Sequence, residues 1–212
     1  MITEEEFVAV KEEIAKAIEK LPDTALVGLI TFNKFVHVHE LTAKINTVYC
    51  VSGSKDYTNV QVLDVLGLQI KNDPRGVCHD IAKKFLVPIG NNREKITKRI
   101  KDVKIDQLIY VNERPLRATS AAINIAITLA ESSPVVPRII TFIGGPCTIG
   151  TGKIIEQSFE KMMRTQNDIY KGENCENYNR ASKYYDLLTK RLVAKKIVLD
   201  IFGFCLDQFG LL

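Results

Sequence analysis

The sequence lacks cysteine pairs, long apolar runs, internal repeats and low-complexity tracts. No apolar run reaches membrane-spanning length, and the acidic start Thr3–Glu6 does not have the pattern of a signal peptide. The cysteines are odd in number and form no CxxC pair, so they do not indicate a disulfide framework or a zinc knot. We interpret them as reduced thiols of a cytosolic protein. They are Cys50, Cys78, Cys147, Cys175 and Cys205.

The composition is that of an ordinary globular chain. Hydrophobic residues make up 46% of its 212 residues, which is enough to bury a sizeable core. A length in this range predicts one large domain or one and a half small ones. The net charge of +4 is too mild to require nucleic acid, so we expect no nucleic-acid partner, although a basic face toward an acidic partner or a membrane is permitted.

One stretch, Arg138–Gly145 (RIITFIGG), predicts the central strand. Its apolar, largely β-branched run is opened by Pro137 and closed by two glycines, a pattern typical of a strand buried on both faces. The helix Thr119–Glu131 precedes it, with apolar residues around most of its axis, and a glycine-rich loop follows. This order predicts an α/β domain, in which functional groups gather at the carboxyl ends of strands.

The other predicted elements alternate between the two types. A capping box at Thr3 starts a first helix that ends before Pro22. Ala25–Phe32 reads as a buried strand, with Phe35–Leu41 as its antiparallel partner at the sheet edge. The remaining predicted elements are a short extension at Thr47–Val51, helices after Thr58 and Asn91, a helix at Ile154–Met163, a long helix at Asn177–Lys195 and a last strand at Ile197–Cys205, with Asp207 capping a further helix. We therefore predict an α/β fold: a mostly parallel, doubly wound sheet covered on both faces, with one antiparallel edge hairpin.

A phosphate-binding loop is one reading of Gly144–Lys153 (GGPCTIGTGK), because it follows a strand and precedes a predicted helix. The spacing does not match. Cys147 stands where a glycine is needed, and Ile154 stands where Ser or Thr would hold magnesium. The alternative reading, a flexible strand-to-helix connection, accounts better for the pattern.

Three further groups of residues each allow a functional and a purely structural interpretation. His37 and His39 share one face of a strand and would bind zinc if a third ligand arrived, or they are solvent-facing polar positions. Cys147 lies beside a predicted helix start, but nothing places His79 near it, so a free loop thiol is favoured over a nucleophile. The lysine-rich helix Arg93–Lys104 is a solvated face or a surface for an acidic partner.

Six blocks of the sequence, in order, resemble one family: the trunk domain of the GTPase-activating subunit of the inner COPII vesicle coat, the Sec-twenty-three type. The matching blocks are ALVGLITFNKFVHVHEL (Ala25–Leu41), SGSKDYT (Ser52–Thr58) leading to LDVLGL (Leu63–Leu68), KKFLVPIG (Lys83–Gly90), RPLRATSAA (Arg114–Ala122), RIITFIGGP (Arg138–Pro146) and LDIFGFCLDQFGLL (Leu199–Leu212). The cargo-selecting sister subunit has a similar trunk, but FIGGP and DQFGLL are more similar to the GTPase activator.

This resemblance implies a von Willebrand A-like fold and a single trunk domain over residues 1–212, which we expect to be a fragment of a larger multidomain chain. It implies a scaffold that pairs with the cargo-selecting subunit and offers surface to the GTP form of the coat small GTPase. It also implies indirect association with the membranes of endoplasmic reticulum exit sites and COPII vesicles, from the cytoplasm. The family's catalytic arginine and zinc module would lie outside this chain, so we expect no enzyme activity and no cofactor. Partner-binding candidates near the strand ends are Arg114, Arg117, Gly144, Gly145 and Pro146.

Two departures from the family pattern matter. Thr119 is similar to the threonine of a von Willebrand A metal site, but Gly144 and Gly145 replace the later aspartate, and one oxygen ligand cannot hold a cation, so we predict no metal there. The family's first strand, which lies in the middle of the sheet, is also missing. We expect either that this strand lies upstream of Met1 or that the strands Ala25–Phe32 and Arg138–Ile143 pair directly.

Two rival functions remain. One is a phosphate- or nucleotide-binding α/β enzyme that uses the loop Gly150–Lys153. The other is a metal-dependent adhesion module, which would need a secretory signal and an acidic-serine motif, and the sequence shows neither.

Overall fold

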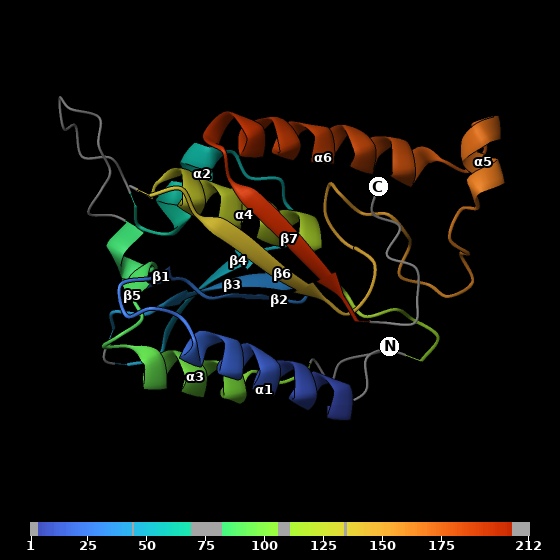
Figure 1. The fold of residues 1–212 in the computed structure, drawn as a ribbon. Coiled ribbons are helices and arrows are strands. Elements are labelled where there is room, and N and C mark those ends of the chain that lie inside the picture. Colours follow the sequence, from blue (N-terminus) through green and yellow to red (C-terminus); the bar gives the residue numbers. More distant parts are fainter. Residues whose placement is uncertain (1–3, 44, 69–81, 106–110, 134, 205–212) are drawn as a thin grey trace.

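The chain folds into strands sandwiched between two layers of helices (Figure 1). The computed structural model describes residues 4–43, 45–68, 82–105, 111–133 and 135–204. On one side, α1 (Glu4–Glu19) packs against α3 (Arg93–Asp102). On the other side, α4 (Thr119–Glu131) packs against α2 (Asn59–Val65) and α6 (Glu176–Lys195). This arrangement confirms the predicted α/β class with helices on both faces.

Three strands form an antiparallel meander. β2 (Ile30–Phe32) pairs with β3 (Phe35–Glu40), and β3 pairs along its whole length with β4 (Thr47–Ser52), from Phe35 opposite Ser52 to Glu40 opposite Thr47. The prediction that β3 lies at the sheet edge is therefore wrong. The short extension expected after Thr47 is a full strand, because its alternating residues match the pleat of β3 residue by residue.

The central strand lies where the sequence placed it, but the prediction that it is buried on both faces is wrong, because Ile140 is 54% exposed. β6 (Arg138–Ile143) pairs in parallel and in register with β7 (Val198–Gly203), from Arg138 opposite Val198 to Ile143 opposite Gly203. Parallel strands need a long crossover, which here contains α5 (Gln166–Lys171) and α6. Among the strands described, this is the parallel pair, and the other three pairings are antiparallel, so the parallel part of the sheet is smaller than we expected.

The predicted strand Ala25–Phe32 is broken in two. β1 (Leu26–Val27) pairs with β5 (Val87–Pro88), which follows a single 3-10 turn, η1 (Ala82–Lys84), whereas β2 pairs with β3. The break falls at Gly28. A Cβ there would lie 3.1 Å from the carbonyl oxygen of Phe85, so a glycine lets the two backbones approach where the chain changes partners.

β2 and β6 do not pair with each other. Within the described residues, β2 pairs only with β3 and β6 only with β7, so the expectation of direct pairing is wrong. The described part of the chain places no strand between them, although α4 packs against both. Among the described residues, no strand fills the gap predicted in the middle of the sheet.

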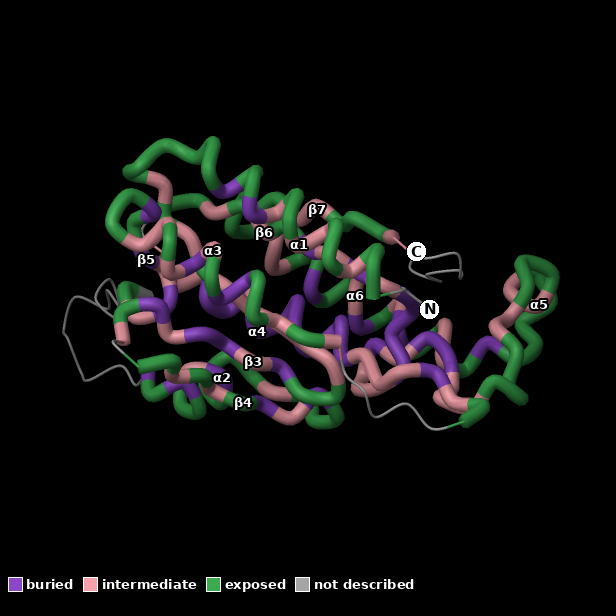
Figure 2. Tube along the Cα trace, turned by 90° about the horizontal axis from the view of Figure 1, so that it is seen from below, coloured by how far each residue is buried: buried purple, intermediate pink, exposed green. Residues whose placement is uncertain are grey.

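The core centres on α4. Nearly all of its residues are buried, from Thr119 to Ala130, and Figure 2 shows the buried stretch running along this helix and β3. Ala121, Ala122 and Ile125 pack against β3, β4 and α2, while Ile123 and Ile127 pack against α6. A helix that is apolar all round needs cover on every side. Here the meander, β6 and α6 provide that cover.

Some predictions differ from the structure or fall outside it. The expected helix Ile154–Met163 is wrong, because these residues form turns and one isolated bridge. Thr3, Cys78, His79, Cys205 and Asp207 lie outside the described residues, so the predictions made on them stay predictions. The first helix and the last strand are confirmed within their described parts, α1 and β7.

Candidate functional site

The carboxyl end of β6 brings Arg117 and Gly145 together. The loop from Gly144 to Pro146 follows β6 directly, and Arg117 stands two residues before α4. A Cβ on Gly145 would lie 2.6 Å from Nη1 and 2.8 Å from Cζ of Arg117, so the guanidinium lies against the glycine backbone. Any side chain at this position would have to displace the guanidinium. Four of the five predicted partner-binding residues thus share one location.

Backbone contacts fix this location. The hydroxyl of Thr148 donates to the carbonyl of Pro115 at 2.9 Å and accepts from the backbone N–H of Arg117 at 2.9 Å. The N–H of Thr148 donates to the carbonyl of Arg117 at 3.1 Å. The buried thiol of Cys147 donates to the same carbonyl at 3.4 Å. The segment that carries Arg117 is therefore clamped to the loop after β6, and Cys147 is part of this clamp.

Arg114, the fifth predicted residue, faces elsewhere. Its side chain is buried, and its Nη1 donates to the carbonyls of Glu156, Ser158 and Lys161 at 3.3, 2.6 and 3.2 Å. Its guanidinium lies 4.5 Å from the ring centroid of Phe159. These contacts explain why no helix forms after Ile154: carbonyls that bond to Arg114 are not used in i to i+4 helical bonds.

The start of α4 holds the threonine that resembles a metal-site residue. Thr119 is buried, and its Oγ1 has no hydrogen-bond partner. Its neighbour Ser120 uses its Oγ to accept from the N–H of Gly152 at 3.3 Å. No group of three or more His, Cys, Asp or Glu side chains gathers anywhere in the described residues. A lone hydroxyl does not make a binding site for a hard cation.

The glycine-rich loop packs against the protein. A Cβ on Gly150, whose φ is +89°, would lie 2.6 Å from the carbonyl oxygen of Gly53, and one on Gly152 would lie 2.4 Å from Cβ of Ser120. Lys153 donates to both carboxylate oxygens of Glu156, at 2.7 and 2.9 Å. These glycines therefore allow close packing. The helix amino end that a phosphate site uses is missing, because residues 154–163 are not helical.

A shallow cavity of about 540 Å³ borders this loop. Leu116 and Ile149 contribute apolar surface, and Lys153, Glu156 and Arg180 contribute charges. The charges are already engaged: Asn177 donates to Glu156 at 3.1 Å and accepts from Arg180 at 2.9 Å. The Lys153 and Asn177 hydrogen bonds lower the pKa of Glu156. Lys153 is neutralised by Glu156, whereas Arg180 bonds to the neutral amide of Asn177, so this wall carries one net positive charge.

His37 and His39 lie in different surroundings, and the described residues bring no third ligand to them. His39 is buried, and its Nε2 lies 3.0 Å from Oγ1 of Thr31. Burial lowers the pKa of His39 to about 4, helped by the nearby charge of Arg99, and burial also lowers the pKa of His37. The interpretation of both histidines as solvent-facing edge positions is wrong for His39, which is buried beside Thr31 and near Arg99 of α3.

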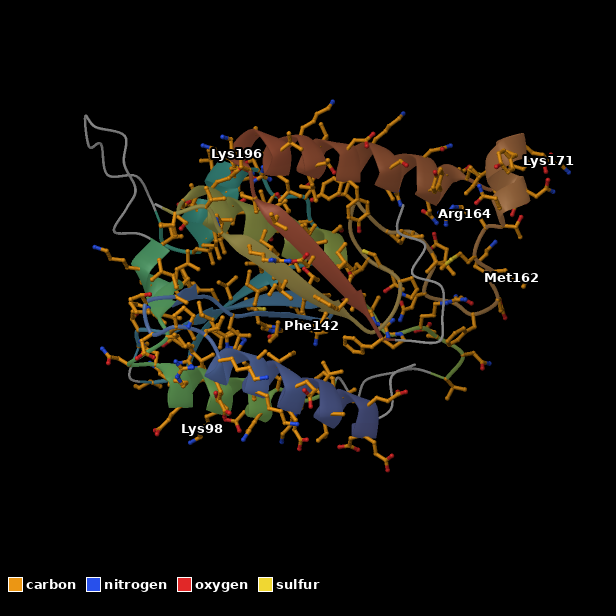
Figure 3. The ribbon with its side chains drawn as sticks, viewed as in Figure 1. Lys98, Phe142, Met162, Arg164, Lys171 and Lys196 are labelled. Atoms are coloured by element: carbon orange, nitrogen blue, oxygen red, sulfur yellow. The ribbon has the colours of Figure 1, made fainter. Side chains whose placement is uncertain are left out.

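The basic helix α3 directs several cations inward. Arg93 donates to the carbonyls of Ile18, Glu19 and Leu21 at 2.6 to 2.9 Å, which caps the end of α1. Lys95 donates to the carbonyls of Leu41 and Ala43, and buried Arg99 to that of Glu40 at 2.8 Å. The solvated-face reading is therefore wrong for these three side chains. It holds for Lys98, which lies on the outer side of α3 (Figure 3).

One exposed apolar feature has no direct signal in the sequence. The turn that Arg114 holds carries Phe159 and Met162, which are 46% and 89% exposed. The sequence pattern of this stretch predicts a helix. The turn forms instead because Arg114 bonds to carbonyls more than 40 positions away, which a local pattern does not reveal.

In the described residues, no helix is long and apolar enough to cross a membrane.

Comparison with known proteins agrees with this geometry. The family model for the Sec23/Sec24 trunk domain matches residues 1–212. Among solved structures, the chain is similar to the crystal structure of the human COPII-coat protein Sec24c, with a TM-score of 0.56 and 14% sequence identity over 96% of this chain. The match spans 25% of the Sec24c chain, so this chain corresponds to about a quarter of that protein's length. At this identity the likeness shows the fold alone.

Proposed function

Because this chain belongs to the Sec23/Sec24 trunk-domain family, we propose that it is a structural and interaction domain of the COPII coat in transport from the endoplasmic reticulum to the Golgi. The observation that carries the proposal is the family match over residues 1–212. The chain would pair with the cargo-selecting coat subunit and contribute surface to the coat small GTPase in its GTP form. It would perform no chemistry and need no cofactor.

The finer assignment is the GTPase-activating type, with the whole of residues 1–212 as one trunk domain. The blocks FIGGP (Phe142–Pro146) and DQFGLL (Asp207–Leu212) support this assignment over the cargo-selecting type. The catalytic arginine of the family would then lie outside this chain. The protein would work in the cytoplasm, on the surface of exit sites and COPII vesicles, without crossing the membrane.

The surface we propose for a partner is the carboxyl end of β6. Arg117 lies against Gly145 in a segment held by Thr148, so its position is set before any partner arrives. A pre-positioned arginine loses little side-chain freedom on binding, and arginine is enriched among residues that dominate interface energies. Arg114 contributes from beneath, through the turn that it holds.

The test is binding of the full chain, wild type and Arg117→Glu, to each purified partner: the cargo-selecting subunit and the GTPase loaded with a non-hydrolysable GTP analogue. Lys98→Glu is the matched control, because it makes the same charge change on the outer side of α3. We expect Arg117→Glu to weaken one of the two interactions at least tenfold and Lys98→Glu to change neither by more than twofold. Thermal melting checks that both variants stay folded.

Two results would count against the proposal in different ways. If the wild-type chain binds neither partner, the coat function is wrong. If it binds but Arg117→Glu binds equally well, the coat function stands and the surface is misplaced. The nucleotide-enzyme alternative is disfavoured, because the glycine loop is packed against Gly53 and Ser120 and leads into turns.

A further inference from the structure

β4 is the outer strand of the antiparallel meander, and one of its edges has no strand partner among the described residues. All six of its residues are in register with β3, from Thr47 opposite Glu40 to Ser52 opposite Phe35, so no bulge turns the strand away. Among the described elements, β3 makes by far the most extensive contact with it (Figure 1). The outward N–H and C=O groups of β4 therefore form a regular row that a further strand can use.

This edge lacks the features by which proteins usually block strand pairing. The strand reads TVYCVS, without a charged residue, a proline or a glycine. Short uncharged segments of high β propensity pair readily with one another. β7, whose outer edge is also unshared among the described residues, differs, because it carries Asp200 in an ion pair with Arg138 and ends in a glycine. The composition of β4 thus favours pairing from edge to edge.

The charges around β4 cancel within one chain. The hydroxyl of Tyr49 accepts from Lys84 at 2.9 Å and donates to Glu40 at 3.3 Å, so a cation and an anion meet at the same oxygen. Lys55 and Asp56, the next charges along the chain, follow the turn after the strand and are also of opposite sign. An acidic or a basic partner therefore gains nothing at this edge, whereas an identical edge meets no like-charge repulsion.

Two copies of β4 can pair only in certain registers. In an antiparallel pair, opposite residues point to the same face of the sheet, and neighbours along one strand point to opposite faces. A two-fold axis between two copies keeps each side chain on its own face, so the residue at the axis lies opposite its own copy. In the middle of β4 this residue is Tyr49 or Cys50.

An axis at Cys50 gives the better contacts. It places Tyr49 opposite Val51 of the second copy, an aromatic and β-branched pair of the kind that stabilises sheets. An axis at Tyr49 would instead bring together the two Lys84 side chains, each of which lies 5.2 Å from its Tyr49 ring centroid. Cys50 is exposed, and burial lowers the pKa of its neighbour on β3, His37, which is therefore uncharged at pH 7.

We infer that β4 is a self-pairing edge: two copies of the chain associate through antiparallel β4 strands about a two-fold axis at Cys50, which joins the two meanders into one sheet. This inference goes beyond the proposed function, because the partner is a second copy of the chain and not another coat protein. One pair of strands buries less than the roughly 1,200 Å² of a stable interface, so the dimer is reversible, with a dissociation constant on the order of 10 µM.

The experiment measures the mass of the full chain by sedimentation velocity in reducing buffer, from about 1 to 200 µM, where we expect a monomer that converts to a dimer. Cys50→Lys puts two ammonium groups opposite each other and should weaken the dimer at least tenfold, whereas Cys50→Ser should change it less than twofold. The matched control is Val193→Lys, which makes the same charge change on α6 at a residue that is 71% exposed. If melting shows that Cys50→Lys is unstable, Val48→Lys tests the same edge.

A second measurement tests the register. Opposite residues of an antiparallel pair have Cα atoms about 4.5 to 5.5 Å apart, which a disulfide can span. Mild oxidation should therefore join two wild-type chains through Cys50, and Cys50→Ser should abolish this crosslink.

The outcomes separate the parts of the inference. A monomer at every concentration, or a dimer that Cys50→Lys leaves unchanged, overturns the self-pairing edge, and the coat function is judged separately by binding to its two partners. Association that continues past the dimer overturns the closed two-fold pair. A dimer that Cys50→Lys disrupts but that forms no Cys50 crosslink overturns the axis at Cys50.

Discussion

Arg191 on α6 forms a bidentate ion pair with Glu131 at the end of α4: its Nη2 lies 2.8 Å and its Nε 3.0 Å from the two carboxylate oxygens. Both side chains are mostly buried, at 22% and 16% exposed. The same guanidinium donates to Oδ1 of Asn124 and to Oγ1 of Thr128 at 2.9 Å. One side chain therefore links the two helices that cover this face of the sheet.

We expect Arg191→Ala to lower the free energy of unfolding by about 3 kcal/mol, because it leaves the buried carboxylate of Glu131 without its partner. Urea unfolding monitored by circular dichroism measures the change. Lys190→Ala, at an exposed position of the same helix, should stay within about 0.5 kcal/mol of wild type. Equal stability of the two variants would show that the pair contributes no stability.

Acidification should destabilise the fold through His39. Its pKa is about 4 in the folded chain against an ordinary value of 6.5, so the unfolded chain binds the proton first as pH falls. The stability that neutral His39 contributes is complete above pH 6.5 and is lost as pH falls toward 4, by about 2–3 kcal/mol. Carboxylates such as Glu156, whose pKa is lowered, add their own loss at lower pH.

The measurement is urea unfolding at pH 7.5 and at pH 4.5 for wild type and His39→Gln. The variant removes the titrating group. Between pH 7.5 and pH 4.5 the wild type should therefore lose more free energy of unfolding than the variant does. A difference in stability between wild type and variant that is the same at both pH values would contradict the buried neutral state of His39.

At Gly53, close packing rather than an unusual backbone conformation explains why the residue is a glycine. Gly53 has an ordinary φ, but a Cβ there would lie 2.2 Å from Cβ of Ala118 and 2.5 Å from the carbonyl oxygen of Lys34. Gly53→Ala should therefore cost about 1–3 kcal/mol through overpacking. Gly172→Ala, at a φ of +70° with nothing within 4 Å, should cost about 1 kcal/mol through backbone strain alone. Thermal unfolding of both variants compares the two costs, and a larger loss for Gly172→Ala would contradict the packing argument.

Phe85, in the turn before β5, and Phe202, in β7, should differ in their contribution to stability. Phe85 is 1% exposed and packs edge-on against Tyr49, so Phe85→Ala should cost about 3–5 kcal/mol. Phe202 is 53% exposed and stacks on Phe142, with ring centroids 5.4 Å apart, so Phe202→Ala should cost about 1 kcal/mol, mainly from the ring pair. Urea unfolding gives both values. Equal costs would mean that another surface covers Phe202 in solution.

Local patterns predicted most of the elements. The apolar run at β6, the all-round apolar α4 and the capping box at Thr58 each contain their own signal, and each element lies where the pattern indicates. The break at Gly28 and the third strand β4 have a different origin, because they depend on which strand each segment meets. Strand pairing is non-local, so short-range patterns do not determine it.

The candidate site was predicted in part for the same reason. Arg117 and Gly144–Pro146 are expected near strand ends, and the structure brings them together, because the preceding helix α4 begins beside the carboxyl end of β6. The inward roles of Arg114 and of the α3 cations depend on carbonyls more than 40 residues away in sequence. From their charge alone, these side chains are expected to face solvent or a partner. Their burial in the structure shows that they bond to the protein's own backbone instead.

The unshared edges of β2 and β6 have a consequence for the amide protons. Along β6, only the N–H groups that point toward β7 have a strand partner among the described residues, and those that point the other way do not. Hydrogen–deuterium exchange along this strand should therefore alternate between slow and fast from one residue to the next. An incoming segment that completed the sheet would slow the fast set and leave the slow set unchanged.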